Sequence, residues 1–443
     1  MKKKVLLLYP GSLFAENCKF CWYLKPYMIY VYTFLKRYFD TKVIDLEIEF
    51  FNLLHDKTKH NKFKEVSLNR ILSEDFDYLA ISCWSSFDYL STKFFAENIK
   101  KIKPKTKIIV GGYHPTYVPE DFNYKSSPFD YIVKGDIENI LKVLNIDSNY
   151  DGNISYPDFL TYPYFSKESN KTIGIFLSRG CPFRCSYCGE KNKKWKALSV
   201  DESIYQILTF IENIEPSHIL ILDSCFGLNN RWRKKFLSEL IEREIKTKFW
   251  VETRVDLLDE EDIELMSKLN IKISFGIESF SQSMLMIMNK TKNPDFFLKQ
   301  FIKLSKLCNK YKIVHDANLI FNHPGESEKT VDEYNTFFKN VLIQELSGSY
   351  LRLIVNNFFY YPGCDIYINY HYYKSRFGTK ILHPEWWKEK EDHHILGRLV
   401  IPSLKENKTP FIAPLKKLYQ QIEDFNNKSK GVEAEIRFWN SPN

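Results

Sequence analysis

Residues 173–188 read Ile173-Gly-Ile-Phe-Leu177-Ser-Arg-Gly-Cys181-Pro-Phe-Arg-Cys185-Ser-Tyr-Cys188, a short apolar run followed by three closely spaced cysteines. The apolar run predicts a strand, and the cysteines follow its C-terminal end, where α/β folds place their chemistry. Closed zinc and iron–sulfur sites use four ligands. Three thiolates on one loop can hold three irons of a [4Fe–4S] cube, which leaves the fourth iron open to a small molecule.

The residue before the third cysteine is aromatic, Tyr187. With it, the stretch resembles the C-x3-C-x-aromatic-C motif of the radical S-adenosylmethionine (radical SAM) superfamily. The resemblance implies that Cys181, Cys185 and Cys188 bind a [4Fe–4S] cluster whose open iron is chelated by SAM. It also implies that an electron from the cluster cleaves SAM to methionine and a 5′-deoxyadenosyl radical. The alternative interpretation is a zinc knuckle or a set of unrelated thiols.

Composition limits the class of protein. The chain has 443 residues, enough for two or three domains, and its net charge of +8 includes no block that indicates a nucleic-acid partner. Nine cysteines in so long a chain do not make a disulfide scaffold, so thiolate ligands imply a reducing compartment. The N-terminal apolar run is too short for a signal peptide, and no run is long enough to span a membrane. We therefore expect a cytoplasmic protein without a membrane partner.

The first part of the chain alternates apolar strands with helices. Strands are predicted at Val5–Leu8, Lys42–Leu46, Tyr78–Ser82, Ile108–Val110 and Tyr131–Val133, with helices around Tyr27–Tyr38, Tyr89–Lys101 and Ile137–Leu144. This order predicts a doubly wound, Rossmann-like parallel sheet that binds ligands beyond the C-terminal ends of its strands. We assign residues 1–148 to this domain and residues 149–170, rich in polar residues and Pro, to a linker.

Two strand ends in this domain carry a recognisable pattern. It consists of Gly111, Gly112, Tyr113, His114, Pro115 and Thr116 after the fourth strand, and Gly135 after the fifth. Paired glycines allow a ligand to approach the backbone closely. These residues resemble the cobalamin (B12)-binding-type domain that precedes many radical SAM cores, which implies that they contact cobalamin. The alternative is a sheet of the same type that has lost the cofactor.

The loop after the first strand departs from the pattern of other cobalamin proteins. It lacks the D-x-H-x-x-G motif whose histidine ligates cobalt, so we expect Trp22, Tyr23 or Trp84 to cover that face of the corrin. The same loop holds Cys18 and Cys21 as an isolated C-x2-C pair. With no second pair nearby, a zinc or redox role for these thiols is the weaker interpretation.

Six further β/α units follow the linker, with strands near residues 173, 219, 249, 272, 315 and 350–356. This number resembles the open, partial (β/α)6 TIM-like barrel of the radical SAM family and not a closed barrel of eight units. We assign residues 171–345 to the barrel and residues 346–443 to a C-terminal extension that caps it. Aromatic residues crowd positions 358–388, where they either cover the open barrel edge or line the substrate pocket.

Polar residues follow the barrel strands and match positions that contact SAM in the family. The resemblance implies a SAM site made of Tyr187, Asp223, Ser224, Glu252, Arg254, Glu278, Ser279 and Asn318. Glu252 and Arg254 lie two residues apart, which would place both side chains on the same face of a strand. A structural ion pair between a carboxylate and Arg254 is the alternative interpretation.

Three functions remain open from the sequence. The first is a cobalamin-dependent radical SAM methyltransferase that acts on an unactivated carbon of a natural-product or peptide substrate. The second is a cobalamin-independent radical SAM cyclase, mutase or oxidoreductase, and the third is an iron–sulfur sensor without turnover. Either enzyme would need a small-molecule or peptide substrate and an external electron donor such as flavodoxin or ferredoxin.

Overall fold

The computed structural model describes residues 2–15, 24–146, 157–165, 172–403 and 412–440. The chain divides into two compact units. Unit 1 comprises residues 1–165 with His383–Gly397, and unit 2 comprises residues 166–382 with Arg398–Asn443. Cys18, Cys21, Trp22 and Tyr23 lie outside the described residues. The domain limits expected at residues 148, 170 and 345 stay a prediction.

Unit 1 is built on a sheet of five parallel strands in the order β2-β1-β3-β4-β5. The strands are β1 (Lys4–Tyr9), β2 (Asp40–Asp45), β3 (Tyr78–Ser82), β4 (Lys107–Gly111) and β5 (Tyr131–Val133). This order confirms the doubly wound prediction. The strand order reverses between β1 and β3, and open α/β sheets bind their ligands at such a switch point.

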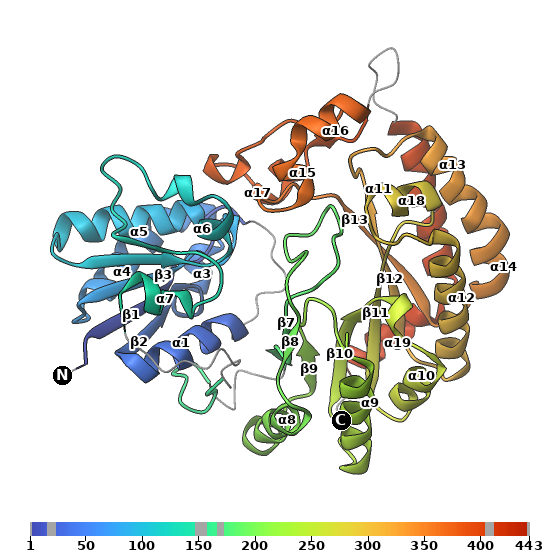
Figure 1. Cartoon of the computed structure of the whole chain (residues 1–443), viewed down its shortest axis with the longest axis horizontal. Coiled ribbons are helices and arrows are strands. Elements are labelled where there is room, and N and C mark those ends of the chain that lie inside the picture. The colour runs from blue at the N-terminus through green and yellow to red at the C-terminus, as the bar shows by residue number, and fades with distance from the viewer. Residues whose placement is uncertain (1, 16–23, 147–156, 166–171, 404–411, 441–443) are drawn as a thin grey trace. The chain divides into compact units, whose positions relative to one another are not determined.

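Helices cover both faces of this sheet because side chains alternate along each strand. Leu6 and Leu8 of β1 pack in one core with Phe63 and Phe95, which belong to α4 (His60–Leu72) and α5 (Tyr89–Ile102). Figure 1 shows α1 (Pro26–Tyr38) on the opposite side of the sheet from α5. The shorter helices of the unit are α2 (Leu46–Glu49), α3 (Phe51–Leu54), α6 (Tyr113–Tyr117), α7 (Asn139–Val143) and α17 (His393–Leu396).

Residues 383–397 pack within unit 1, although they were expected in the extension that caps the barrel. Trp386 and Trp387 are fully buried. The indole nitrogen of Trp387 donates to Asp121 (2.8 Å), and the ammonium of Lys388 pairs with the same carboxylate (2.7 Å). The two buried indoles and the ion pair stabilise this segment in unit 1. The aromatic composition of the segment did not show which unit its side chains would pack against.

Unit 2 contains six parallel strands in the order β13-β12-β11-β10-β9-β6. They are β6 (Thr172–Ile175), β9 (His218–Ile221), β10 (Lys248–Thr253), β11 (Ile271–Glu278), β12 (His315–Phe321) and β13 (Leu351–Asn357). Each strand pairs with its predecessor in this series, and in the described chain β6 and β13 do not pair with each other. This is the predicted partial barrel.

Helices connect these strands and lie along one side of the sheet in Figure 1. They are α8 (Val200–Ile214), α9 (Asn230–Glu242), α10 (Glu260–Ser267), α11 (Gln282–Ile287), α12 (Pro294–Lys310), α13 (Glu328–Phe337) and α14 (Ile343–Leu346). The C-terminal part adds α15 (Asp365–Ile368), α16 (Tyr370–Phe377), α18 (Ile412–Asn427) and α19 (Lys430–Asn440). Two short hairpins pair β7 (Ser178–Arg179) with β8 (Lys196–Ala197) and β14 (Lys380–Ile381) with β15 (Val400–Ile401).

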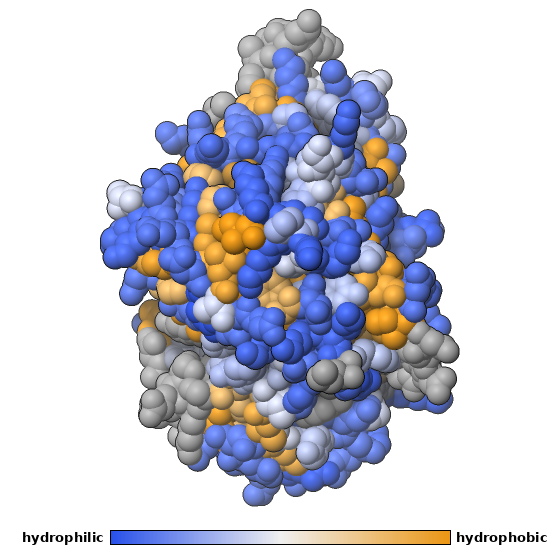
Figure 2. Space-filling model, turned by 90° about the vertical axis from the view of Figure 1, so that its left-hand side faces the viewer, coloured by the Kyte–Doolittle hydropathy of each residue, from blue (hydrophilic) through white to orange (hydrophobic). Residues whose placement is uncertain are grey.

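The surface view in Figure 2 shows one face of the molecule as mainly hydrophilic, with separate apolar areas. In the described part of the chain, no helix has both the length and the apolar character that a membrane span requires.

Candidate active site

The cysteine loop leaves the barrel after β6 and is anchored there by Asp223. The Asp223 carboxylate accepts hydrogen bonds from the amides of Leu177 (2.8 Å) and Ser178 (3.0 Å) and from the Ser178 hydroxyl (2.5 Å). Burial raises the pKa of Asp223 to about 6. Its side chain therefore ties the end of β9 to the start of the cysteine loop, and its contact with SAM stays a prediction.

A second anchor holds the middle of the loop. The Ser186 amide donates to the carbonyl of Met288 (2.8 Å), and the Ser186 hydroxyl lies 2.9 Å from Nε2 of His323. Nδ1 of His323 lies 2.8 Å from the Pro324 carbonyl, so Nδ1 donates there and Nε2 accepts from Ser186. Burial lowers the pKa of His323 to about 4 and keeps it neutral. His323, which stands beside the Pro-Gly-Glu turn, is not among the site residues predicted from the sequence.

Arg254 is fixed beside the cysteines by several contacts. It binds Asp256 through Nε (2.9 Å) and Nη2 (2.7 Å), and Nη2 also donates to the carbonyl of Lys290 (2.7 Å). Its guanidinium lies 3.8 Å from the ring centre of Phe183, and Nη1 is 3.8 Å from the sulfur of Cys185. The carboxylate partner is Asp256, not Glu252, because β10 ends at Thr253 and strand alternation does not extend to Arg254.

Tyr187 of the cysteine motif reaches a carboxylate on a neighbouring strand end. Its hydroxyl donates to Oε1 of Glu278 (2.8 Å), and the ammonium of Lys290 lies 3.0 Å from the same oxygen. Lys290 is buried, which makes this a charge pair inside the protein. No sequence motif predicted Lys290 as a site residue. It lies in the loop after α11, and only the fold brings it beside β11.

The remaining expected SAM residues lie within or directly after the barrel strands. Asn318 donates to Ser274 (2.9 Å) and to Glu252 (3.4 Å). The Glu252 side chain is open to water, yet the surrounding protein raises its pKa to about 7, mainly by desolvation and then by repulsion from Glu278. Ser279 is buried. Ser224 is exposed.

The three thiols of the motif are free, and a [4Fe–4S] cube would bind each of them to a different iron. Among the described residues, no three His, Cys, Asp or Glu side chains are grouped closely enough to hold one ion. A cube needs its thiolates further apart, because each binds a different iron. Cys181 and Cys185 are buried and Cys188 is half-buried, and none is in a disulfide. Burial first, and then the neighbouring thiols, raises the pKa of Cys188 to about 12, a cost that cluster iron would offset.

In unit 1, the Gly-Gly loop makes close contacts with neighbouring parts of the chain. Gly112 has φ of +120°, and a Cβ there would lie 2.4 Å from the Cys83 carbonyl oxygen. The Thr116 hydroxyl donates to the Gly112 carbonyl (2.6 Å) and accepts from the Gly135 amide (2.8 Å). His114 is buried between Ser86 (2.8 Å) and Asp121 (3.2 Å). The loop is thus a rigid corner, and its contact with a corrin stays a prediction.

The switch point of unit 1 presents a flat aromatic surface. Trp84 follows β3, is 42% exposed and stacks on Tyr27 with ring centres 3.9 Å apart. Nearby, the hydroxyls of Ser12 (2.5 Å) and Tyr9 (3.1 Å) donate to Asp88. An exposed indole stacked on a half-buried tyrosine beside a polar cluster fits a large, flat cofactor with polar substituents such as a corrin.

Two protein families match these two units. The model of the radical SAM superfamily matches residues 175–338, and that of the B12 binding domain matches residues 30–145. The chain is a radical SAM enzyme with a B12-binding domain. The radical SAM domain implies a [4Fe–4S] cluster and SAM, and the B12-binding domain implies cobalamin, as predicted.

The curated relatives of this radical SAM enzyme include methyltransferases and cyclases by name. An uncharacterized methyltransferase of Pyrococcus horikoshii is 22% identical over 350 residues, which cover 71% of this chain and 72% of the relative. An anaerobic magnesium-protoporphyrin IX monomethyl ester cyclase of Rubrivivax gelatinosus is 24% identical over 53% of this chain and 49% of its own length.

A solved structure resembles nearly the whole chain in fold. The radical S-adenosylmethionine methyltransferase TsrM from Kitasatospora setae, solved with cobalamin and a [4Fe–4S] cluster bound, superposes with a TM-score of 0.63. The match covers 97% of this radical SAM enzyme and 89% of TsrM at 14% identity. At that identity the likeness concerns the fold.

Proposed function

We propose that this radical SAM enzyme transfers a methyl group from SAM, by way of cobalamin, to an unactivated carbon of a natural-product or peptide substrate. The observation that carries the proposal is the contact of the cysteine loop with both Arg254 (3.8 Å from Cys185) and Glu278 (2.8 Å from Tyr187). These contacts place a guanidinium and a carboxylate beside the three thiols, in a chain that also has a B12-binding domain.

Three thiolates, Cys181, Cys185 and Cys188, would hold the cluster. When bound, the cluster and cobalamin supply the reductive cleavage of SAM and the carriage of its methyl group. Arg254 offsets negative charge at the Cys185 sulfur and, through its stack on Phe183, restrains the loop.

SAM carries an ammonium, a carboxylate and ribose hydroxyls, and the strand ends offer partners for them. Glu278 is held in one orientation by Tyr187 and Lys290, so it can accept a hydrogen bond without reorganising. Glu252 is open to water and can accept another. Asn318 and the exposed Ser224 offer neutral donors. Asp223 acts through Ser178 as a positioning residue.

In unit 1, we propose that cobalamin occupies the switch point beyond β1, β3 and β4. Trp84 would offer its face to the corrin. The corner made by Gly111, Gly112, Tyr113, His114, Pro115 and Thr116, with Gly135 bonded to it, would border the nucleotide tail. The loop after β1 contains no histidine, so cobalt would have no protein histidine from that loop.

The decisive experiment measures two products separately. Anaerobic protein, reconstituted with iron and sulfide and reduced with dithionite, is given SAM with and without hydroxocobalamin. Loss of the methyl group leaves S-adenosylhomocysteine, and reductive cleavage leaves 5′-deoxyadenosine. Methyl transfer requires cobalamin-dependent S-adenosylhomocysteine, and Cys181→Ala/Cys185→Ala/Cys188→Ala should abolish both products and the ~400 nm cluster band.

A cyclase among the relatives favours a second candidate, a radical SAM cyclisation, which we consider in its cobalamin-independent form. It predicts 5′-deoxyadenosine with no S-adenosylhomocysteine, whether or not cobalamin is added. A protein that binds the cluster but makes neither product would be a sensor. For each enzyme we propose a cytoplasmic location, a small-molecule or peptide substrate and an external electron donor.

A further inference from the structure

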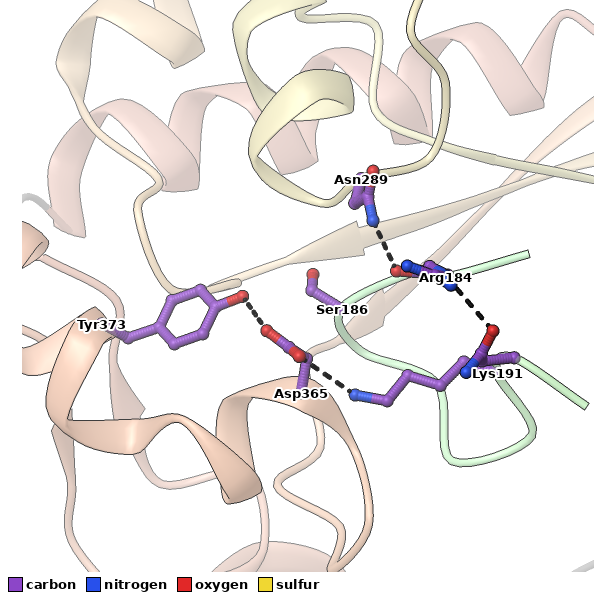
Figure 3. A pocket seen from close by; sticks show the side chains of 7 residues that line it. Arg184, Ser186, Lys191, Asn289, Asp365 and Tyr373 are labelled. Carbon is purple, nitrogen blue, oxygen red and sulfur yellow. Dashed lines mark hydrogen bonds and ion pairs between the residues drawn. The ribbon is translucent and has the colours of Figure 1, made fainter. Parts of the chain in front are cut away.

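A polar pocket lies on the outer side of the cysteine loop. Its volume is about 390 Å³, and Arg184, Ser186, Lys191 and Asn192 from the loop form one wall. Asp365 and Tyr373, from α15 and α16, form the other wall, as Figure 3 shows. None of the residues expected to contact SAM lines this pocket, so the pocket is distinct from the proposed SAM site.

The contacts around the pocket leave it electropositive. Asp365 accepts from Lys191 (3.2 Å) and from the Tyr373 hydroxyl (2.9 Å), so its negative charge is matched by one lysine. Arg184 donates to Asn192 (3.2 Å), a neutral partner, and its side chain is exposed. The pocket therefore retains the charge of Arg184.

Positive charge continues along the segment that follows. Between positions 184 and 196 the sequence has five basic residues and one acidic residue, Glu190. This excess of four charges is half of the net charge of +8 of the whole chain. Lys194 and Lys196 are exposed, and the half-buried residue Cys188 lies within the same segment.

We propose that this basic segment, residues 184–196 with the adjoining pocket, is the docking surface for a small acidic one-electron carrier protein. The inference rests on the proposed function, since a cluster that cleaves SAM must be reduced from outside the protein. The carrier loses one electron, the cluster gains one, and no atom is transferred. Clustered charges of one sign raise the encounter rate with a partner of opposite charge and orient it.

The location selects an electron carrier over a nucleic acid. The segment is short and is continuous with the loop that carries the cluster ligands, so a protein docked there approaches the most exposed of the three thiols. A nucleic acid would need basic side chains along a longer path to neutralise successive phosphates.

The test compares binding with two different reductants. Arg184→Glu/Lys194→Glu reverses two exposed charges of the segment. The matched control, Lys299→Glu/Lys303→Glu, makes the same change on α12, where both lysines are exposed. Binding of a purified flavodoxin, and of a ferredoxin in parallel, is measured at low and high salt, and 5′-deoxyadenosine formation is driven by either flavodoxin or dithionite.

We expect the Kd for flavodoxin to rise about tenfold in the segment variant at low salt and not in the control, with the difference shrinking at high salt. Flavodoxin-driven cleavage should fall with it, whereas dithionite-driven cleavage should stay unchanged. Glu190→Gln removes the single acidic residue and should tighten binding, an effect that damage to the fold cannot produce.

Equal Kd values in the segment variant and the control overturn the proposal, as does failure of both carriers to bind the unaltered protein. Tighter binding of an RNA hairpin than of flavodoxin, lost in the same variant, would assign the segment to nucleic acid instead. Absence of dithionite-driven cleavage in the unaltered protein refutes the proposed function, and the Kd comparison still decides the docking surface.

Discussion

The hydroxyl of Tyr187 donates a 2.8 Å hydrogen bond to Glu278, which is 91 residues away in the sequence. The ammonium of Lys290 binds the same oxygen, and both charged side chains are buried. This contact joins the cysteine loop to β11, so the loop geometry and the carboxylate position depend on each other.

Removing the cation from this pair should destabilise the protein. Lys290→Met leaves Glu278 buried without its partner, and we expect a loss of about 3 kcal/mol in the free energy of unfolding, measured by denaturant titration. Lys290→Met/Glu278→Gln should recover part of it. As a control, Lys299→Met removes an exposed pair with Asp295 and should cost less than ~0.5 kcal/mol. Equal losses for the buried and exposed lysines would contradict the prediction.

Arg254 should affect SAM cleavage without affecting iron content. Arg254→Lys keeps a charge but cannot bind Asp256 through two nitrogens and stack on Phe183 as well. We expect 5′-deoxyadenosine formation to fall by about tenfold, equivalent to ~1.4 kcal/mol of transition-state stabilisation, with iron per chain unchanged. Arg243→Ala, at an exposed position directly after α9, serves as the control. Loss of iron in Arg254→Lys would show that the guanidinium is needed to assemble the cluster.

Glu326 should make stability depend on pH. Burial raises its pKa to about 8 in the folded protein, well above its ordinary value of 4.5. The unfolded chain releases this proton at lower pH than the folded protein, so the free energy of unfolding should fall as the pH rises from about 4.5 to 8. Glu326→Gln cannot ionise and should lose this slope of up to ~1.4 kcal/mol per pH unit. Melting curves at pH 5.5 and 8 test this, with exposed Glu328→Gln expected to keep the slope.

The segment of residues 383–397 should be needed for the stability of unit 1. Trp387→Leu leaves a cavity and removes a donor from Asp121, and we expect a loss of about 3 kcal/mol in the free energy of unfolding. Trp84→Leu, at an exposed position, should cost less than ~1 kcal/mol. Denaturation of the cofactor-free protein measures both. A small loss at Trp387 would mean that the segment is dispensable.

Trp84 should contribute to the affinity for cobalamin. Trp84→Ala removes the exposed ring of the stacked pair and should weaken hydroxocobalamin binding about tenfold in equilibrium dialysis, a loss of ~1.4 kcal/mol. Ile102→Ala, also exposed in unit 1, should leave the affinity unchanged. Unaltered affinity in Trp84→Ala would place the corrin elsewhere.

Strand positions and fold class could be predicted because they depend on local patterns. The limits predicted from the apolar runs match those of β3 and β5, and the other strands of unit 1 differ by a few residues at their ends. Helix α4 was missed because its apolar residues form a weak periodic pattern. The three cysteines and Tyr187 are adjacent in the sequence, so their motif was visible without a structure.

The amino-acid sequence alone determined the chemistry of the site: three thiols on one loop, glycines after β4 and carboxylates after the barrel strands. Only the tertiary structure decided the partners of these groups. Arg254 pairs with Asp256, Glu278 with Lys290, and His323 with Ser186, and the last pairing joins residues that are 137 positions apart in the chain. The physical reason is that a buried polar side chain must find a partner in space, and the folded backbone, not the order of residues, sets which groups are within reach.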